Sequence, residues 1–398
     1  MCRLENFRIF NFKFMKVVII IPTYNESESI KATIEGLQKE FNKIKSHQMH
    51  ILVFDSNSKD DTRKIVKNLQ KRYKNLHLQT EKEKSGLGGA YIKAMRYAMD
   101  KMTADAVFEY DADGSHQPKY ISGMVKALDG GADVVVGSRY VPGGKMPADW
   151  GLHRKLMSFV GNLIARVVLL TPQYKDMTSG FRGTKTKCLK KVDLKNLLSK
   201  QFAYKLHLYY ALHKLGAKIA EYPIEFIDRG RGESKFPKNN IKDSLKVVFT
   251  LRLRESQRFI KVCLVGGIGA LIQFTFFNIL RGILAPEWAN SVAVELAIVS
   301  NFIINNSWTF ADKKIKAKHG KKRMVAKFLQ FNFFSLGSIL IQFLVIKIGT
   351  AIFGRGLLLE NLLVAVGILI GLIYNFTIYT RLIWRVHKNK SEIRNPKS

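Results

Sequence analysis

Two aspartates at the end of an apolar run are the residues whose type and spacing most directly suggest chemistry. Asp111 and Asp113 close the segment AVFEYDAD (106–113), which has the composition of a buried strand. Where a strand ends, its pleat no longer separates carboxylates at i and i+2, so they can converge. Hard oxygen ligands of this kind suit Mg²⁺ or Mn²⁺ held against a diphosphate. The alternative is a solvated acidic turn, because Asp-x-Asp also occurs by chance.

A further acidic residue, Asp55, ends another apolar run and begins the segment DSNSKDDT. Two interpretations of it stay open. Asp55 belongs either to a pocket for a base and ribose or to a helix-capping loop in which Ser58 or Asp60 is the cap. The glycines within 86–89 present a similar choice between a phosphate cradle and a tight turn into the next helix.

Basic residues that can neutralise a diphosphate follow later in the chain. Arg139 comes directly after the strand pattern ADVVVGS. The glycine-rich segment DRGRGESK (228–235) carries Arg229, Arg231 and Lys235. Cations on such a mobile loop can close over a diphosphate and offset its charge as it departs. A solvated basic loop at a membrane surface is the alternative interpretation.

All these residues lie in a part of the chain where short apolar runs alternate with helical patterns. We expect strands at 16–24, 50–55, 76–79 and 106–113, with helices at 28–41, at 61–73 and after Gly88. This order predicts a mostly parallel sheet wound with helices on both sides. In such sheets ligands bind above the carboxyl ends of the strands, so the acidic strand ends are expected to share one site.

Composition narrows the class of protein further. The chain has 398 residues, more than a single hydrophobic core usually holds, and its 47% hydrophobic content excludes general disorder. Three widely spaced cysteines exclude a disulfide scaffold and give no zinc or iron–sulfur pattern. The net charge of +34 is spread along the chain, densest beside apolar segments and without interleaved stacking aromatics. Attraction to an anionic membrane leaflet therefore explains the charge better than nucleic acid does.

The C-terminal part is dominated by apolar stretches near the length of about 20 residues that crosses a hydrocarbon core. The stretches are 262–280, 288–310, 328–346 and 361–380. They carry no charge apart from Glu295, which predicts four membrane-spanning helices. The segment between the second and third carries eight Lys/Arg and one Asp, so we expect this loop and both termini on the cytoplasmic side.

Several details accompany the spans. Residues 240–258 mix apolar and basic positions at helical spacing, which predicts either a helix lying in the membrane interface or a plain linker helix. The N-terminus lacks a signal peptide pattern, and Met15 is a candidate start. Polar residues within the spans are expected to bridge helices rather than line a transport path, and they are Gln273, Glu295, Asn301, Asn305, Asn306, Asn332 and Gln342.

Seven blocks, taken in order, resemble the dolichol-phosphate mannose synthases, which are inverting glycosyltransferases of GT-A fold. The blocks are IIPTYNESESI (20–30), DSNSKDDT (55–62), GLGGAYIKAM (86–95), DADGSHQPKYI (111–121), GSRYVPGG (137–144), DMTSGFRG (176–183) and EFIDRGRGESK (225–235). The membrane part resembles the four-span GtrA-like domain through RFIKVCLVGGIGALIQF (258–274) and SNFIINNSWTF (300–310).

The resemblance implies an α/β GT-A domain with a mostly parallel sheet, followed by an all-α four-helix transmembrane domain. The expected divisions are an N-terminal extension at 1–15, the catalytic domain at 16–237, an interfacial amphipathic helix at 238–258, the GtrA-like domain at 259–386 and a cytoplasmic tail at 387–398. The catalytic domain is expected on the cytoplasmic side of the membrane.

The resemblance also implies roles for individual residues. The base and ribose would be held by Pro22, Tyr24, Glu26, Val53 and Asp55. The diphosphate would meet Asp111, Ala112 and Asp113, and Asp111, Asp113 and Ser115 would bind the metal. The cations around the donor and acceptor phosphates would be Arg139, Arg229 and Lys235. The residues expected to act in catalysis are Asp111, Asp113, Arg139 and Arg229.

Some positions depart from the family pattern. Ser56 and Asp61 stand where the family usually has Asp and Gly, so base or ribose contacts can differ. The run Lys205-Leu206-His207 replaces a frequent Gln-Met-Glu, which leaves the choice of donor open. His207 lies on an apolar helical face, where a packed core residue is the better interpretation than a catalytic base.

The implied reaction moves mannose from GDP-mannose to the phosphate of dolichol or another polyprenol, with inversion at C1, for protein or lipid glycosylation. A phosphate monoester has a second pKa of about 6, so it is already ionised and needs no general base. Two alternatives are a polyprenyl-phosphate glucosyltransferase using UDP-glucose and a glycolipid flippase with a regulatory nucleotide-sugar-binding domain. A broken-helix repeat, expected of a transporter, is not evident. The sequence indicates no protein partner.

Overall fold

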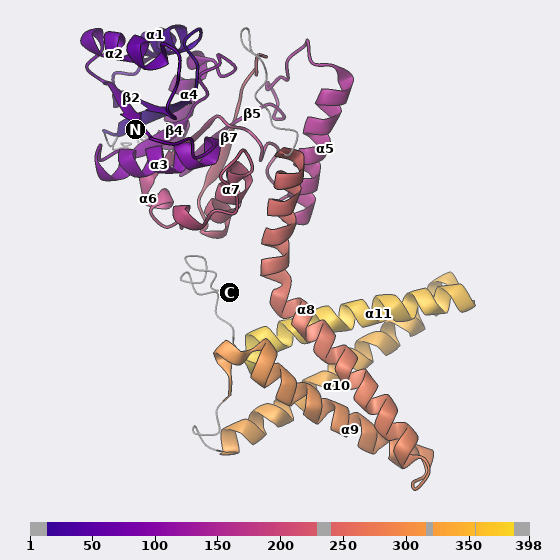
Figure 1. Ribbon diagram of the computed structural model, residues 1–398. Helices are drawn as coiled ribbons and strands as arrows, with labels where there is room; N and C mark the ends of the chain where they lie inside the picture. The colour runs from indigo at the N-terminus through magenta and orange to yellow at the C-terminus, as the bar shows by residue number, and fades with distance from the viewer. Residues whose placement is uncertain (1–13, 229–239, 316–320, 355, 386–398) are drawn as a thin grey trace, which may run out of the picture. The chain divides into compact units, whose positions relative to one another are not determined.

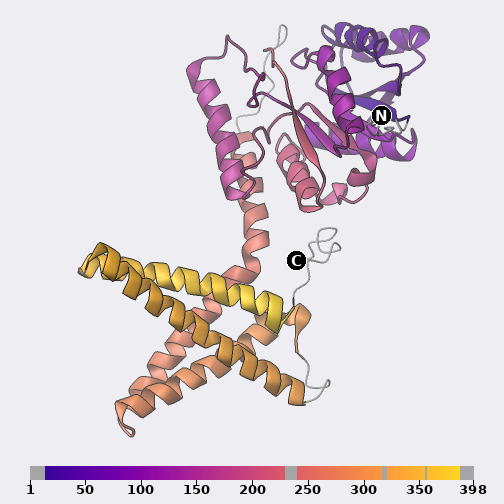
Figure 2. The ribbon, with the colours of Figure 1, turned by 180° about the vertical axis from the view of Figure 1, so that it is seen from behind.

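The computed structural model describes residues 14–228, 240–315, 321–354 and 356–385. The chain forms two compact units, an α/β unit and a helical unit, which divide between Arg252 and Leu253 (Figures 1 and 2). The extension predicted at 1–15 is described only from residue 14, and the tail at 387–398 lies outside the described residues. The same is true of the predicted phosphate-binding cations Arg229, Arg231 and Lys235.

A seven-stranded sheet in the order β3-β2-β1-β4-β6-β5-β7 forms the centre of the α/β unit. The strands are β1 (Lys16–Thr23), β2 (Gln48–Asp55), β3 (Leu76–Thr80), β4 (Ala106–Glu109), β5 (Val134–Ser138), β6 (Arg182–Lys185) and β7 (Ile219–Pro223). Neighbouring strands are parallel except where β6 pairs with β4 and β5. The predicted mostly parallel α/β architecture is therefore confirmed, with one antiparallel strand that the apolar runs did not indicate.

Helices cover both faces of this sheet and make up the second unit. They are α1 (Ile30–Phe41), α2 (Thr62–Arg72), α3 (Leu87–Asp100), α4 (Ile121–Asp129), α5 (Leu152–Val168), α6 (Thr186–Leu189), α7 (Tyr204–Lys214), α8 (Asn240–Leu280), α9 (Pro286–Ile304), α10 (Lys321–Phe353) and α11 (Leu357–Ile378). Short 3₁₀ or π turns lie at Pro118–Tyr120, Leu194–Asn196, Asn305–Thr309, Ala311–Lys313 and Tyr379–Ile383.

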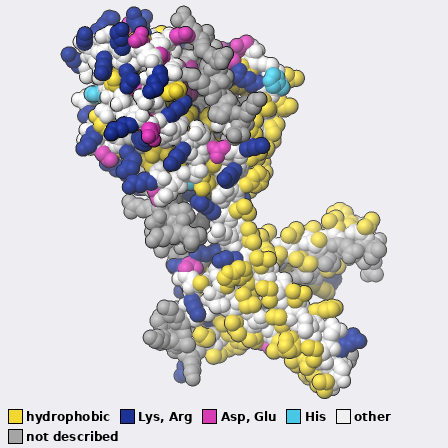
Figure 3. All heavy atoms as spheres, viewed as in Figure 1, with side chains coloured by type: hydrophobic (Ala, Val, Ile, Leu, Met, Phe, Trp, Pro, Cys, Tyr) yellow, Lys and Arg dark blue, Asp and Glu magenta, His cyan; other side chains and the backbone are white. Residues whose placement is uncertain are grey.

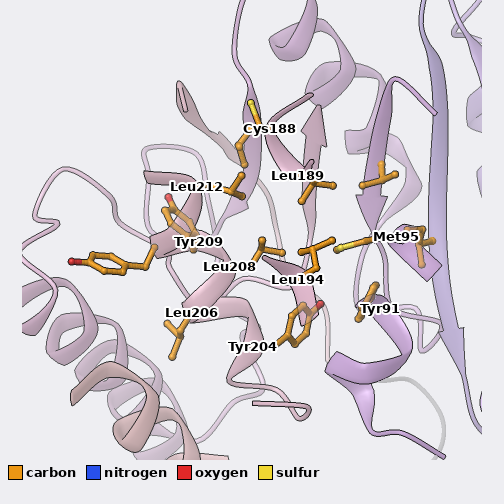
Figure 4. Close-up of a cluster of buried hydrophobic side chains, with 14 of the residues drawn as sticks. Tyr91, Met95, Cys188, Leu189, Leu194, Tyr204, Leu206, Leu208, Tyr209 and Leu212 are labelled. Carbon is orange, nitrogen blue, oxygen red and sulfur yellow. The ribbon is translucent and has the colours of Figure 1, made fainter. Parts of the chain in front are cut away.

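Strand β1 shows how the sheet comes to have two cores. Successive side chains of a strand point to opposite faces, so a continuous apolar run can be buried on both. Val18 and Ile20 belong to one core, which α3, α6 and α7 cover. Val17 and Ile19 belong to the other, which α1 and α4 cover. Figure 4 shows part of the first core, where side chains from α3 and α7 meet.

One ion pair lies inside the sheet. Arg182 of β6 and Glu109 of β4 are each 1% exposed, and the Arg182 Nε lies 2.6 Å from Glu109 Oε2. The Tyr204 hydroxyl donates a hydrogen bond to the other oxygen of Glu109. Burial alone would lower the pKa of Arg182, but the adjacent Glu109 raises it, so the guanidinium stays charged. This contact joins β4, β6 and the start of α7.

Helix α8 runs without a break from Asn240 to Leu280. From residue 240 on, the segment predicted as an interfacial helix is therefore continuous with the first apolar stretch, and its place in a membrane interface stays a prediction. Its first turns pack against the α/β unit, because Val247, Val248 and Leu251 are buried in the first core and Ser199 donates a hydrogen bond to Asp243. This packing places the division between the units at residue 252, within the helix.

In the described part of the chain, three helices are long and apolar enough to cross a membrane: Asn240–Leu280, Met324–Phe353 and Ala365–Ile383. The second predicted span corresponds to α9 with the π turn that follows it, and it is not among the three. Hydrophobic side chains gather over the helical unit in Figure 3, whereas Lys and Arg are frequent over the α/β unit. The prediction of apolar helices holds, while the number of four spans stays a prediction.

Some of the polar residues expected to bridge helices do so, whereas the side-chain oxygens of Asn301 and Asn305 are buried without a hydrogen-bond partner. Asn332 of α10 donates hydrogen bonds of 2.9 and 3.1 Å to the carboxylate of Glu295 in α9. Asn306 accepts a hydrogen bond from the indole of Trp384 at 3.0 Å. Trp384 also stacks on Phe310, with ring centroids 4.4 Å apart. These contacts satisfy polar groups that an apolar environment would otherwise penalise.

A pair of histidines makes the α/β unit sensitive to acid. The ring nitrogens of His50 in β2 and His77 in β3 lie 3.2 Å apart. Burial is the main cause that lowers the pKa of both rings below the ordinary 6.5. The charge of Lys16 adds to it for His77, and the charges of His77 and then Lys16 add to it for His50. The unfolded chain therefore binds more protons than the folded chain below pH 6.5, so stability falls as pH drops through this range.

We predict that His77→Gln reduces this acid sensitivity. The melting temperature of the detergent-solubilised chain should fall less between about pH 7.5 and pH 5.5 in the variant than in the wild type, because one depressed pKa is gone. His153→Gln, which changes an exposed histidine, is the control and should behave like the wild type. An equal pH-dependent loss in His77→Gln and the wild type would contradict the prediction.

Candidate active site

The predicted metal ligands lie in the turn that follows β4. The strand ends at Glu109, earlier than the predicted 113, so Asp111 and Asp113 stand beyond the edge of the sheet. Asp111 Oδ1 accepts a hydrogen bond of 2.9 Å from the hydroxyl of Tyr91. Asp113 Oδ1 accepts one of 3.0 Å from the backbone N–H of Ser115. The turn therefore holds both carboxylates in place, and the Asp111 side chain stays 27% exposed.

This ligand set fits a divalent cation that is shared with a substrate. Among the described residues, no group of three or more His, Cys, Asp or Glu side chains is placed to hold a metal ion. Mg²⁺ and similar ions, however, are usually held by one or two carboxylates together with substrate phosphates and water. Asp111 and Asp113 match that pattern. The expected third ligand, Ser115, is only 2% exposed, and its backbone serves the turn.

Two side-chain nitrogen atoms lie near Oδ2, the second carboxylate oxygen of Asp111. His116 Nε2 and Lys205 Nζ are each 3.9 Å from Asp111 Oδ2, and both side chains are buried. Burial lowers the pKa of His116 despite the opposing charges of Asp111 and Asp113, so the ring is neutral near pH 7. Its Nδ1 accepts a hydrogen bond from the backbone N–H of Asp111. The other nitrogen beside Asp111 is the amino group of Lys205.

The loops after β1 and β2 form a second part of the site. These strands are parallel neighbours, with Thr23 paired to Asp55, so their ends meet at one edge of the sheet. Three backbone N–H groups of the first loop donate hydrogen bonds to side chains of the second loop. One backbone N–H of the second loop donates to a side chain of the first. The pairs are Asn25 with Ser58, Glu26 with Thr62, Ser27 with Asp60, and Lys59 with Asn25.

Asp60 shows how strongly these loops are organised. Burial alone would raise its pKa, but hydrogen bonds from Thr62 and Ser27 lower the pKa of Asp60 to about 2. Asn25 adopts a positive φ of 55°, a conformation that Asn tolerates better than most residues. The PTYNE and DSNSKDDT blocks are thus joined by hydrogen bonds into one structure.

The residues expected to hold a base and ribose differ in accessibility. Asp55 is fully buried and accepts hydrogen bonds from the Thr23 and Ser58 side chains and from the Ser58 backbone. Asp55 thus organises the loop from within. The N-cap of α2 is Asp61, not the predicted Ser58 or Asp60, and the pocket for a base and ribose stays a prediction. Val53 is also fully buried. Pro22, Tyr24 and Glu26 are half-buried, and Lys84 Nζ lies 3.6 Å from the centroid of the Tyr24 ring.

Arg139 is engaged by a carboxylate of its own chain. Its Nε and Nη2 donate hydrogen bonds of 2.7 and 2.8 Å to the two oxygens of Asp176, and Nη2 also donates to Thr178. Asp176 is fully buried, and the Arg139 side chain is 10% exposed. Burial alone would raise the pKa of Asp176, but Arg139 lowers it. The expected phosphate-binding cation is thus part of a bidentate ion pair.

The glycine run resolves one of the open alternatives. The N–H groups of Gly88 and Gly89 donate to the carbonyl of Lys200, at 2.9 and 3.2 Å. A Cβ atom on Gly88 would clash with Tyr204, and Gly86 has a φ of 85° that favours glycine. These amides are committed to the protein, so the run forms a tight turn into α3 rather than a phosphate cradle.

Several residues of the site were not found from the sequence, and they are Tyr91, Glu109, His116, Arg182 and Tyr204. Each lies in a helix, strand or turn whose neighbours in space are far away in the chain. In the sequence, Lys205 stands out only as a departure from the family pattern. His207 accepts a hydrogen bond from the backbone of Leu198, as expected of a packed residue.

Comparisons with known proteins show the family of the chain. Residues 18–193 match the model of glycosyl transferase family 2, and residues 261–384 match that of the GtrA/DPMS transmembrane domain. An undecaprenyl-phosphate mannosyltransferase of Micrococcus luteus is 37% identical over 221 residues, which are 56% of this chain and 87% of the relative. A dolichol-phosphate mannosyltransferase of Pyrococcus furiosus is 30% identical over 374 residues, 93% of this chain and 99% of the relative. The chain belongs to the polyprenol-phosphate mannosyltransferase family.

As a member of this family, the chain is a glycosyltransferase and a membrane protein. The similarity to the Pyrococcus relative extends across both units. Among solved structures, glucosyl-3-phosphoglycerate synthase of Mycobacterium tuberculosis is 17% identical with a TM-score of 0.43, covering 60% of this chain and 78% of that one.

We predict that Asp176→Asn destabilises this polyprenol-phosphate mannosyltransferase family member by about 3–5 kcal/mol, because it leaves the buried charge of Arg139 unpaired. Thermal or denaturant unfolding of the detergent-solubilised chain measures the change. Asp100→Asn, at an exposed position at the end of α3, is the matched control and should change stability little. A loss in Asp176→Asn no larger than in the control would show that the ion pair contributes little.

Proposed function

We propose that the chain transfers mannose from GDP-mannose to the phosphate of dolichol or a related polyprenol, with inversion at C1. The observation that carries this proposal is the pair Asp111 and Asp113 at the carboxyl end of β4, in a chain similar to a dolichol-phosphate mannosyltransferase over 93% of its length. In a parallel sheet, ligands bind at this end of the strands. The product is a lipid-linked mannose for protein or lipid glycosylation.

The donor would lie across two neighbouring parts of the site. Its base and ribose would contact the joined loops after β1 and β2, near Pro22, Tyr24 and Glu26. Val53 and Asp55 would support this pocket from within, since both side chains are fully buried. The diphosphate would extend toward Asp111, Ala112 and Asp113. This division follows the order in which the strands β2, β1 and β4 lie side by side.

Asp111 and Asp113 would hold Mg²⁺ or Mn²⁺, and Ser115 would maintain the turn. The ion would supply charge neutralisation at the diphosphate, an effect worth several kcal/mol in comparable sites. Tyr91 would keep Asp111 oriented, because burial and the neighbouring carboxylate raise the pKa of Tyr91 and keep it a hydrogen-bond donor. Arg229 and Lys235, which lie outside the described residues, would bind phosphate groups together with Arg139.

The acceptor explains why a site of this kind needs no general base. A polyprenyl phosphate carries its nucleophilic oxygen already ionised near neutral pH. The histidine beside the carboxylates, His116, is held neutral by burial and accepts a backbone hydrogen bond. A lipid acceptor also gives the apolar helices a purpose. We propose four spans, with the catalytic unit and both termini on the cytoplasmic side, where the loop between the second and third spans is rich in Lys and Arg.

We predict that Asp111→Ala combined with Asp113→Ala lowers metal-dependent turnover by at least about a hundredfold, since several kcal/mol of transition-state stabilisation are lost. Mannosyl transfer is measured with purified protein, Mn²⁺ and a short polyprenyl phosphate. Asp100→Ala is the control for removal of an exposed carboxylate. The melting temperature should show that the double variant is folded. Undiminished transfer by a folded double variant would remove the metal assignment.

A donor panel tests the identity of the sugar nucleotide. We expect GDP-mannose to be used in preference to UDP-glucose with the same polyprenyl phosphate acceptor. The departures at Ser56 and Lys205 make this test necessary, because the base pocket and the sugar end of the site each differ from the family pattern. Preference for UDP-glucose would overturn the proposed donor. Translocation of a glycolipid without any transfer would instead favour a flippase.

A further inference from the structure

Lys205 is a buried cation beside Asp111 for which the proposed reaction does not yet have a use. Its side chain is 1% exposed, and its Nζ lies 3.9 Å from Asp111 Oδ2. It stands in the first turn of α7, where the partial positive charge of the helix N-terminus disfavours a lysine. Helix preferences therefore do not explain why a lysine stands at this position. The groups that surround its ammonium must stabilise it.

The surroundings direct the ammonium toward the carboxylate turn. Nζ lies 4.9 Å from the ring centroid of Phe202 and 5.9 Å from that of Tyr91, so aromatic faces flank it. A Cβ atom on Gly180 would clash with Nζ and would lie 3.3 Å from Asp111 Oδ2. The absence of a side chain at Gly180 thus gives the ammonium its place beside Asp111.

The distance between the two charges is informative. At 3.9 Å, Nζ and Asp111 Oδ2 attract each other but are too far apart for a hydrogen bond. A buried ammonium is expensive to desolvate and is stabilised best when its hydrogens are bound by negatively charged oxygens. Asp111 alone meets this need only in part. An anionic ligand at the carboxylate turn would meet it further.

We propose that Lys205 is a built-in cation of the donor site, whose ammonium binds the diphosphate of the sugar nucleotide and shares Asp111 with the divalent cation. The inference rests on the proposed function, because it takes the ligand to be a sugar nucleotide. Two consequences follow from the charges. Lys205 and the metal repel each other when the nucleotide is absent, since both are attracted to Asp111. With the nucleotide present, both neutralise the same diphosphate.

The first experiment measures binding of GDP and of UDP by calorimetry to the full-length, detergent-solubilised chain in EDTA. The wild type should bind one of them without metal. Lys205→Gln should weaken that binding on the order of ten- to a hundredfold, the range for a hydrogen bond to a charged group. Lys187→Gln removes an exposed lysine that pairs with Asp133, and it should leave the affinity unchanged.

The second experiment titrates Mn²⁺ alone and follows the free ion by electron paramagnetic resonance. Lys205→Gln should bind Mn²⁺ several-fold more tightly than the wild type, because a competing cation at Asp111 is gone. The opposite directions of the two effects separate this role from general damage to the site, which would weaken both. Unchanged or weaker Mn²⁺ binding by Lys205→Gln would overturn the proposal, and so would unchanged metal-free nucleotide binding.

The tests also separate this inference from the proposed function. If the enzyme prefers a UDP-sugar, the proposed donor is wrong, but the effect of Lys205 then appears with UDP instead of GDP. If Lys205→Gln does not fold, Lys205→Met removes the charge with a similar side-chain volume. The wild type tests the proposal even if neither variant folds. If GDP and UDP bind to it with Mn²⁺ but neither binds in EDTA, the proposed role of Lys205 is wrong.

Discussion

The ion pair between Glu109 and Arg182 is the interaction on which the site depends most. Both residues are almost completely buried, and Glu109 also accepts a hydrogen bond from Tyr204. The pair joins the last residue of β4 to the antiparallel strand β6 and to the start of α7. Asp111 follows Glu109 closely, and Lys205 follows Tyr204. The relative position of the carboxylate and the ammonium is therefore set by a contact inside the core.

Continuous apolar runs made half of the sheet predictable. The predicted strands at 16–24 and 50–55 agree closely with β1 and β2, because strands buried on both faces carry little besides apolar residues. The strand predicted at 76–79 also agrees with β3, although LHLQT is only partly buried. The acidic residues that follow the predicted strands could be assigned to one edge of the sheet, because the strands were expected to be parallel. Strand β6 has the sequence RGTK and no apolar run, so its antiparallel pairing was not visible.

Contacts between distant parts of the chain were beyond the reach of sequence patterns. Arg139 could be located as a cation, but its bidentate partner Asp176 lies 37 residues away in the chain. Asp55 looked like a ligand-binding strand end, but Thr23 and Ser58 surround its carboxylate. Charged residues could be located from the sequence, whereas their partners could not. Only the fold shows which charges are satisfied by the protein itself.

The ladder of hydrogen bonds between the loops after β1 and β2 has a thermodynamic consequence. Side chains such as Ser58, Asp60 and Thr62 already hold the backbone of the opposite loop. The two loops already lose most of their conformational entropy when the chain folds. Binding of a ligand there therefore costs little further loop entropy. Discrimination at such a preorganised surface depends on shape and on mismatched polar groups, because the loops have little freedom to adapt to a poorer ligand.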